Sequence, residues 1–355
     1  MRRFSASLRP GLAAVALAAT ALSLTACGGT GTAAGASDAG TVTVYSADGL
    51  SGWYKPQFAE FTKETGIAVN LVEAGSGEVV SRVEKEQSNP QADIVVTLPP
   101  FIQKADAQGL LQPSGVDTSA VPAEEKDPAG KYVPVVGNFL SFIANPGANP
   151  APATWDDLLT EQYRGKLQYS TPGQAGDGTA VLLLLQHLRG KEGGLDYLSK
   201  LQANNVGPSS STGKLQPKVS NGELLVANGD VQMNLASIKD DGSKFGVFFP
   251  AEANGSRTTV SLPYVMGLAK GAPRSEQAKK LMEYLLSEKA QKTVGPDALG
   301  VSVRKDVREA ATLDLGDKST PAGLLSGVTV WTPDWNAVLA GLDADVAAYQ
   351  KATGS

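Results

Sequence analysis

Cysteine and histidine are nearly absent from this sequence, and their scarcity excludes several kinds of active site. The 355 residues include one cysteine and one histidine. A single cysteine forms no intramolecular disulfide and no cysteine metal cluster, and a single histidine rules out histidine-based zinc sites. Ser-His-Asp and Cys-His catalysis also have few parts to work with. The histidine, His187, lies inside an apolar helical pattern, where a structural or surface role is expected.

Strong charge of one sign and long apolar runs are missing as well. The formal net charge is −5, and acidic and basic residues are well mixed. Without a basic run, no nucleic-acid partner is expected. After the first 26 residues, no apolar stretch is long enough to span a bilayer. These absences favour a protein that is not an enzyme and needs neither cofactor nor metal; only a metal site built from carboxylates stays open.

The first 26 residues have the pattern of a secretory signal peptide. A basic start is followed by an apolar run from Leu12 to Leu24. The sequence Leu24-Thr25-Ala26-Cys27 resembles the bacterial lipoprotein processing site, in which the cysteine becomes the lipidated first residue of the mature chain. We therefore expect a signal peptide at 1–26, a lipidated Cys27 with a flexible tether over 27–40, and anchoring to the outer face of the cell membrane.

The next segment alternates strand and helix patterns three times. The pattern predicts strands at Thr41–Ser46, Ile67–Val72 and Ala92–Thr97, and helices at Trp53–Thr65, Val79–Gln87 and Ile102–Gln108. Such alternation is typical of βαβ units with a parallel sheet. Ligands bind at the carboxyl ends of the strands in such sheets. The ends here are small or carry a hydroxyl: Ser46, Gly75-Ser76-Gly77 and Thr97.

A Gly-rich turn in the second half predicts an anion site. The predicted strand Leu167–Tyr169 leads into Ser170–Thr179, and an apolar helix begins at Ala180. Backbone N–H groups at such a helix start, with hydroxyls beside them, bind anions, and glycine lets a ligand approach closely. A capped helix after a loop is the alternative interpretation. A second hydroxyl-rich loop follows at Pro208–Lys214.

The remaining pattern predicts several further elements. A helix is expected over Val219–Gly229 and a strand over Val231–Ser237. Thr154-Trp155-Asp156-Asp157 fits a capping box at a helix start. The last helix is expected to begin with Thr332 as its N-cap.

Five segments together resemble the solute-binding proteins of ABC importers, of the ferric-binding-like type II periplasmic-binding-protein fold. More closely, they are similar to the 2-aminoethylphosphonate-binding proteins. The segments are Val44–Leu50, Ser170–Thr179, Leu201–Pro208, Ser211–Leu215 and Ala227–Asn234, and the resemblance covers about residues 41–350.

The resemblance implies an α/β fold of two lobes, with mixed sheets flanked by helices and the ligand cleft between the lobes. Lobe 1 would comprise residues 41–138 and 260–311, and lobe 2 residues 139–259 and 312–355. The implied function is that of an extracytoplasmic lipoprotein, a monomer, that binds a small organophosphonate, 2-aminoethylphosphonate, in the cleft. It would deliver this ligand to an ABC permease and ATPase, and touch the membrane through its lipid alone.

One departure from the resemblance argues against iron as the ligand. Ferric-binding members carry adjacent tyrosines just after the segment that matches Val231–Asn234, where this chain has Leu235-Ala236-Ser237. Fe(III) is a hard ion that needs anionic oxygen ligands, and this pair of phenolates is missing.

The implied ligand has an anionic and a cationic end, and each end needs its own partners. Hydroxyls and backbone N–H groups are expected to hold the phosphonate, and carboxylates or an aromatic face the ammonium. The candidates for the phosphonate are Ser46, Ser76, Gly77, Thr97, Ser170, Thr171, Gly178, Thr179, Ser211 and Thr212, with Asn234 as a further ligand residue. The candidates for the ammonium are Glu78, Asp177, Asp48 and Tyr264.

Other functions stay open at this point. The same fold takes other solutes, such as phosphate, sulfate, a carboxylate or a polyamine like putrescine. A lipoprotein that senses its ligand without transporting it has the same sequence features. A secreted phosphoesterase is the competing enzyme class, but it needs metal ligands or an activated nucleophile, which this chain hardly offers.

Overall fold

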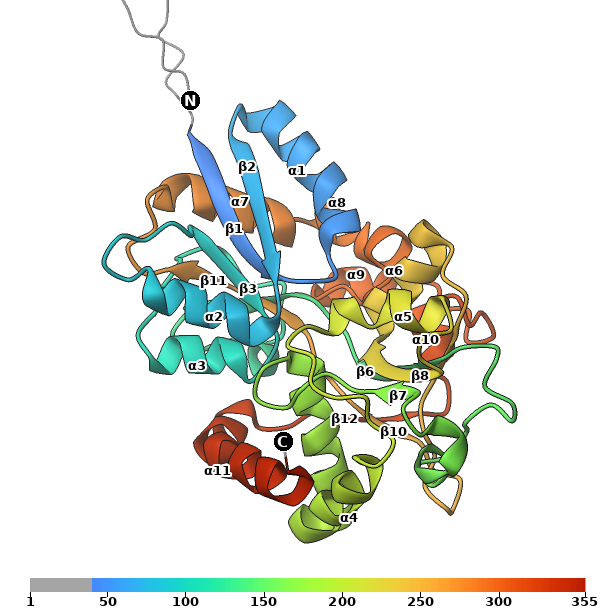
Figure 1. Ribbon diagram of the computed structural model, residues 1–355. Helices are drawn as coiled ribbons and strands as arrows, with labels where there is room; N and C mark the ends of the chain where they lie inside the picture. Colours follow the sequence, from blue (N-terminus) through green and yellow to red (C-terminus); the bar gives the residue numbers. More distant parts are fainter. Residues whose placement is uncertain (1–39, 355) are drawn as a thin grey trace, which may run out of the picture. The chain divides into compact units, whose positions relative to one another are not determined.

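The computed structural model describes residues 40–354, and its first sheet is built by the three predicted strand–helix units (Figure 1). The strand order is β2-β1-β3-β11-β4, and β5 also pairs with β11. The strands are β1 (Thr41–Ala47), β2 (Ala68–Ala74), β3 (Ile94–Thr97), β4 (Leu111–Gln112), β5 (Tyr132–Val136) and β11 (Tyr264–Ala269). β1 is parallel to β2 and β3, whereas β11 is antiparallel to its three neighbours. The predicted signal peptide, Cys27 and the tether up to residue 39 lie outside the described residues.

Helices cover both faces of the first sheet because successive strand residues point to opposite faces. Val44 packs into a core that includes Trp53 of α1 (Ser51–Thr65) and Leu281 of α7 (Ser275–Leu286). The next residue, Tyr45, packs instead against α2 (Ser76–Lys85) and α3 (Phe101–Ala107). Each of these three helices begins within four residues of the end of the strand before it, so the starts of α1, α2 and α3 lie at the edge of the sheet where β1, β2 and β3 end.

The second sheet has the order β7-β8-β6-β9 and mixes parallel and antiparallel pairs. Its strands are β6 (Leu140–Ala144), β7 (Leu167–Gln168), β8 (Val226–Asp230) and β9 (Gly246–Phe248). The long helix α4 (Gly176–Leu201) contacts this sheet and also α11 (Trp335–Thr353). A separate parallel pair, β10 (Thr258–Val260) and β12 (Thr329–Trp331), lies beside α4, where Trp331 stacks on the ring of His187.

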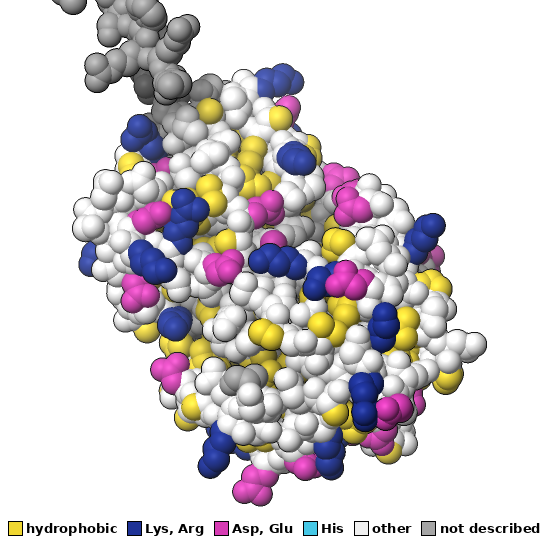
Figure 2. All heavy atoms as spheres, viewed as in Figure 1, with side chains coloured by type: hydrophobic (Ala, Val, Ile, Leu, Met, Phe, Trp, Pro, Cys, Tyr) yellow, Lys and Arg dark blue, Asp and Glu magenta, His cyan; other side chains and the backbone are white. Residues whose placement is uncertain are grey.

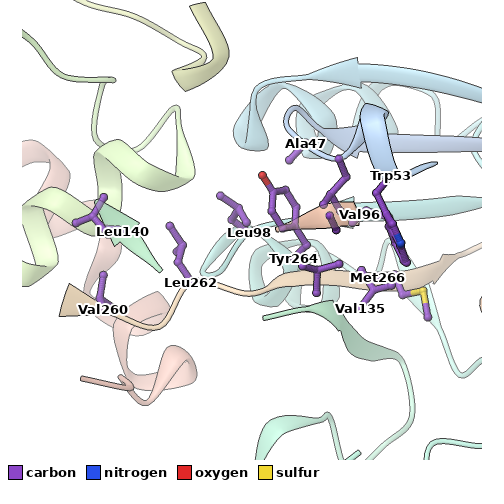
Figure 3. Close-up of a cluster of buried hydrophobic side chains, with 14 of the residues drawn as sticks. Ala47, Trp53, Val96, Leu98, Val135, Leu140, Val260, Leu262, Tyr264 and Met266 are labelled. Atoms are coloured by element: carbon purple, nitrogen blue, oxygen red, sulfur yellow. The ribbon is translucent and has the colours of Figure 1, made fainter. Parts of the chain in front are cut away.

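Two neighbouring segments connect the sheets. Phe139 pairs with Ser261, and the N–H of Leu262 donates to the carbonyl of Asn138 at 2.8 Å. Figure 3 shows Val260, Leu262, Tyr264 and Met266 along one continuous segment that runs from β10, which contacts β6 of the second sheet, into β11 of the first sheet. The boundaries of the two lobes stay a prediction, but these segments are where the chain passes between the sheets.

Two adjoining secondary-structure predictions are wrong. The predicted helix Val219–Gly229 is the short helix α5 (Gln216–Ser220) followed by strand β8, because Gly222, at φ +75°, turns the chain. The predicted strand Val231–Ser237 is the start of helix α6 (Val231–Asp241). The carboxylate of Asp230 accepts a hydrogen bond from the N–H of Met233 at 2.6 Å, which caps α6.

Smaller differences concern helix starts. Asp334, not Thr332, caps α11 by accepting from the N–H groups of Asn336 and Ala337. The predicted capping box forms, with Asp157 accepting from the N–H of Thr154 at 2.8 Å, but only a turn of 3₁₀ helix follows it. Within residues 40–354, no helix is both long and apolar enough to cross a membrane. On the face drawn in Figure 2, basic and acidic side chains alternate without a patch of one sign.

Gln291 of α8 (Glu288–Gln291) generates a stability prediction. Its fully buried amide donates to the carbonyls of Val135 and Leu285, both at 2.9 Å, and accepts from Ser302 and Val303. In the variant Gln291→Leu these buried groups lose their partners, at about 1–3 kcal/mol each. We expect urea denaturation to show a loss of at least about 3 kcal/mol in the free energy of unfolding. Gln350→Leu, exposed on α11, should change it by under about 0.5 kcal/mol; equal effects would contradict the prediction.

Candidate functional site

The carboxyl-end edges of the two sheets face each other. We call the segments that meet there the facing loops: residues 48–49 and 75–78 after β1 and β2, and residues 170–178, 209–213 and 230–232 on the side of the second sheet. Direct hydrogen bonds join them. The N–H of Gly77 donates to the carbonyl of Gln174 at 2.9 Å, and the Ser210 hydroxyl donates to Glu78 at 2.8 Å.

Ser170 is held in a network of buried polar side chains. Its Oγ accepts from the Thr212 hydroxyl at 2.9 Å and from the Asn228 amide at 3.1 Å, while its N–H donates to Asn228 at 2.8 Å. All three side chains are at least 98 % buried. Since a hydroxyl has one proton and two lone pairs, these contacts fix the Ser170 oxygen in place among the facing loops. The neighbouring Thr171 accepts from the N–H of Ser209 at 2.9 Å and so ties the two hydroxyl-rich loops together.

The start of α4 lies against this network. A Cβ on Gly178 would come within 2.0 Å of the Ser170 carbonyl oxygen, so only glycine fits. Thr179 donates to the carbonyl of Ala175 at 2.8 Å and accepts from the N–H of Gly173 at 2.9 Å. Its hydroxyl therefore shapes the turn from within.

The first sheet brings its own predicted residues to the facing loops. Ser76, 4 % exposed, begins α2, and its Oγ lies 2.9 Å from where a Cβ on Gly176 would be. The Thr97 hydroxyl donates to the carbonyl of Ser76 at 3.1 Å. Glu78 accepts from the N–H of Gly75 at 3.2 Å, which closes the first turn of α2.

Tyr264 and Asp48 connect the two sides. The Tyr264 hydroxyl lies 3.0 Å from the Asp48 carbonyl oxygen and 3.2 Å from Oδ2 of Asp230, so it contacts both sides at once. Figure 3 shows this hydroxyl directed toward Ala47, at the end of β1. The Asp48 carboxylate accepts from the Ser211 hydroxyl at 2.5 Å and from the N–H of Gly213 at 3.0 Å.

Three aspartates at the facing loops have raised pKa values. Burial, and next the charge of Asp230, raise the pKa of Asp177 well above its usual range. Burial raises the pKa of Asp230 to about 6, against the hydrogen bond from Met233, and burial also raises the pKa of Asp48. By contrast, the hydrogen bonds from Ser210 and Gly75 lower the pKa of Glu78. In the protein without ligand, burial thus disfavours the charged form of these three carboxyls.

The structure brings most of the predicted residues together, with two exceptions. Ser46 donates to the carbonyl of Ala47 at 2.8 Å within its own strand. Asn234 lies in α6 and donates to Ser141 of β6 at 3.0 Å, inside the second sheet's packing. Sequence reasoning missed Asp230 and Asn228. An aspartate directly before an apolar segment is an N-cap signal, and it could have identified the end of β8 and the start of α6.

Of two hollows in the surface, one is lined in part by the facing loops and the other lies away from them. One of about 420 Å³ is bordered by Gly77, Glu78, Gln174 and Ser210, with basic residues of α2 and α3 around it. Another of about 950 Å³, between α6, α9 (Lys305–Ala310) and α10 (Pro321–Leu325), contains no predicted site residue. Within residues 40–354, no group of three or more His, Cys, Asp or Glu side chains is placed to hold a metal ion.

The raised pKa of Asp177 leads us to predict that its contribution to stability falls as the pH rises. The folded protein holds the proton of this carboxyl to a higher pH than the unfolded chain does. Its contribution to the free energy of unfolding is therefore complete below about pH 4 and lost as the pH rises. The loss in the free energy of unfolding is about 1.4 kcal/mol for each unit by which folding raises the pKa. Asp177→Asn removes this loss because asparagine does not ionise. We expect urea denaturation of ligand-free protein to show the variant gaining stability over wild type between pH 4 and pH 8; a constant difference would contradict this.

Comparison with known proteins identifies the class to which this arrangement belongs. The chain is 50% identical over 321 residues to a protein of Salmonella typhimurium named "Putative 2-aminoethylphosphonate-binding periplasmic protein", covering 88% of this chain and 93% of the relative. It is 28% identical over 302 residues to "Iron uptake protein A1" of Synechocystis, covering 77% of this chain and 83% of the relative.

Solved structures agree on the fold. A periplasmic binding protein from Actinobacillus pleuropneumoniae with bound fructose-6-phosphate has a TM-score of 0.70 at 19% identity, covering 88% of this chain and 97% of that one. The apo ferric ion-binding protein A of Pasteurella haemolytica has a TM-score of 0.66 at 20% identity, and the match again covers 88% of this chain and 97% of that one. The predicted two-lobe type II fold is thereby confirmed. The profile of the bacterial extracellular solute-binding protein family matches residues 43–292, and the chain belongs to this family of extracytoplasmic ligand carriers of the ABC transport type.

Proposed function

We propose that this protein binds 2-aminoethylphosphonate between the facing loops and delivers it to an ABC permease and ATPase. The observation that carries the proposal is that hydroxyl donors and buried carboxylates occur side by side at one interface of the two sheets. A ligand with an anionic and a cationic end finds partners for both there. The 50% identity to a relative with this ligand in its name supports the same choice.

The phosphonate end would be bound by hydroxyls and helix starts. The Ser170 hydroxyl is fixed beside the start of α4, and Ser76 lies at the start of α2, a helix of ten residues. Charge-assisted hydrogen bonds contribute about 1.5–3 kcal/mol each, so a few suffice for micromolar binding, about −8 kcal/mol. The other proposed contacts are Gly77, Thr97, Thr171, Gly178, Thr179, Ser211 and Thr212, and the ammonium would contact Glu78 or Asp177, with Tyr264 beside it.

The cellular setting completes the proposal. Lipidation of Cys27 would anchor the protein to the outer face of the cell membrane, and the protein would work as a monomer without catalysing a reaction. Closure of the two sheets over the ligand, with the segments at 137–139 and 261–263 as the hinge, would hold the ligand during delivery.

Calorimetric titration of the mature protein tests the ligand. We expect micromolar or tighter binding of 2-aminoethylphosphonate, and at least tenfold weaker binding of phosphate, methylphosphonate and putrescine, because each lacks one of the two charged ends. Preferential binding of phosphate, sulfate or putrescine would replace the proposed ligand by that solute. Absence of heat with 2-aminoethylphosphonate would contradict the proposal.

Ser170→Ala tests the place of the phosphonate. Removing the hydroxyl should weaken 2-aminoethylphosphonate binding about tenfold or more, because one charge-assisted hydrogen bond to the phosphonate is lost. Ser199→Ala, exposed on α4, is the matched control and should leave the dissociation constant unchanged. An affinity of Ser170→Ala within twofold of wild type would show that the anion is bound elsewhere.

A further inference from the structure

We infer that Asp177, Asp230 and Asp48 form a subsite for a primary ammonium, with Oδ1 of Asp177 as its central acceptor. The inference deepens the proposed function, on which its choice of ligand rests: it assigns the cationic end of the ligand to aspartates and not to Glu78. It also adds Asp230, which sequence reasoning did not single out, to the binding site.

The three carboxylates come from different elements and differ in how they are satisfied. Oδ1 of Asp230 accepts from the N–H of Met233 and Oδ2 from Tyr264, so this carboxylate is fixed at the start of α6. Oδ2 of Asp48 is fixed by Ser211 and Gly213. Asp177, at the start of α4, is 2 % exposed, and its Oδ1 has no hydrogen-bond partner. Oδ1 of Asp177 is therefore a buried acceptor without a donor, beside two carboxylates that are fixed by hydrogen bonds.

An unpartnered carboxylate oxygen is costly when it is buried. Mutual repulsion adds to the cost, since the charge of Asp230 raises the pKa of Asp177 and the charge of Asp48 raises that of both. None of the ion pairs within residues 40–354 includes any of the three aspartates. A cation with hydrogen-bond donors removes both penalties, and an ammonium provides three donors on one charge.

The charged residues around the three aspartates do not supply this cation, so it would have to come from the ligand. Glu73 and Glu78 add negative charge from β2 and α2, and the basic residues that act on them are Lys55 and Lys214. Both oxygens of Glu78 already accept hydrogen bonds, from Ser210 and Gly75, and its side chain is exposed. The Tyr264 hydroxyl closes the other side of the subsite against Asp230.

A pair of ligands isolates the contribution of the ammonium. Calorimetry would compare 2-aminoethylphosphonate with ethylphosphonate, which has the same skeleton without the amine, on wild type and on Asp177→Asn. We expect Asp177→Asn to raise the dissociation constant of 2-aminoethylphosphonate at least thirtyfold over wild type. The dissociation constant of ethylphosphonate should stay within threefold of wild type. In the control Asp196→Asn, the same change at an exposed position of α4, the ratio of the two affinities should stay within threefold of wild type. Equal effects of Asp177→Asn on both ligands, or none on either, would overturn the inference.

Asp230→Asn is the second variant, because asparagine caps a helix as well as aspartate does and only the charge is lost. Asp230→Asn should raise the dissociation constant of 2-aminoethylphosphonate at least tenfold and that of ethylphosphonate by less than threefold. An unchanged ratio of the two dissociation constants would overturn the role of Asp230. If wild type binds neither phosphonate, the proposed function fails by itself. Titration with ethylamine and putrescine then decides the subsite: binding that Asp177→Asn abolishes supports it, and no binding of either amine overturns it.

Discussion

The hydroxyl of Tyr264 is the contact on which the arrangement of the site depends. Tyr264 is the first residue of β11, where the segment from β10 enters the first sheet, and its hydroxyl reaches the Asp48 carbonyl on one side and the Asp230 carboxylate on the other. Because β1 and β8 end at these two aspartates, the hydroxyl fixes how the carboxyl-end edges face each other. Polar groups without a partner are costly in such a buried place, so each carboxylate there is held by a backbone or side-chain donor, with Oδ1 of Asp177 as the exception.

The first sheet was largely predictable from the sequence, because local signals and tertiary packing agree there. β-branched strands of four to seven residues alternate with amphipathic helices, and Gly66 ends α1 in the left-handed conformation that only glycine adopts easily. Parallel strands then bring their carboxyl ends to one edge without further information. For the same reason Ser76, Gly77 and Thr97 could be placed near one another before their contacts were known.

The second sheet shows where such reasoning fails. β8 contains Asn228, Gly229 and Asp230, residues that are depleted in strands. It forms nevertheless, because β6 and β7 pair with it on both sides and Asn228 bonds to Ser170. This polar strand has no period of apolar residues, and the sequence pattern therefore suggested a helix over Val219–Gly229, which covers most of β8, and a strand after it. Asp230, whose carboxylate contacts the Tyr264 hydroxyl, was missed for this reason.

The central claim is that a zwitterionic phosphonate binds between the facing loops with its two ends on different partners. A crystal structure of the complex with 2-aminoethylphosphonate tests it most directly. The account predicts ligand density between Ser170 and Asp177, with the nitrogen within hydrogen-bond distance of Oδ1 of Asp177 and a phosphonate oxygen on the Ser170 hydroxyl. Density in the hollow beside α2 and α3, or a ligand with its phosphonate toward the aspartates, would contradict it.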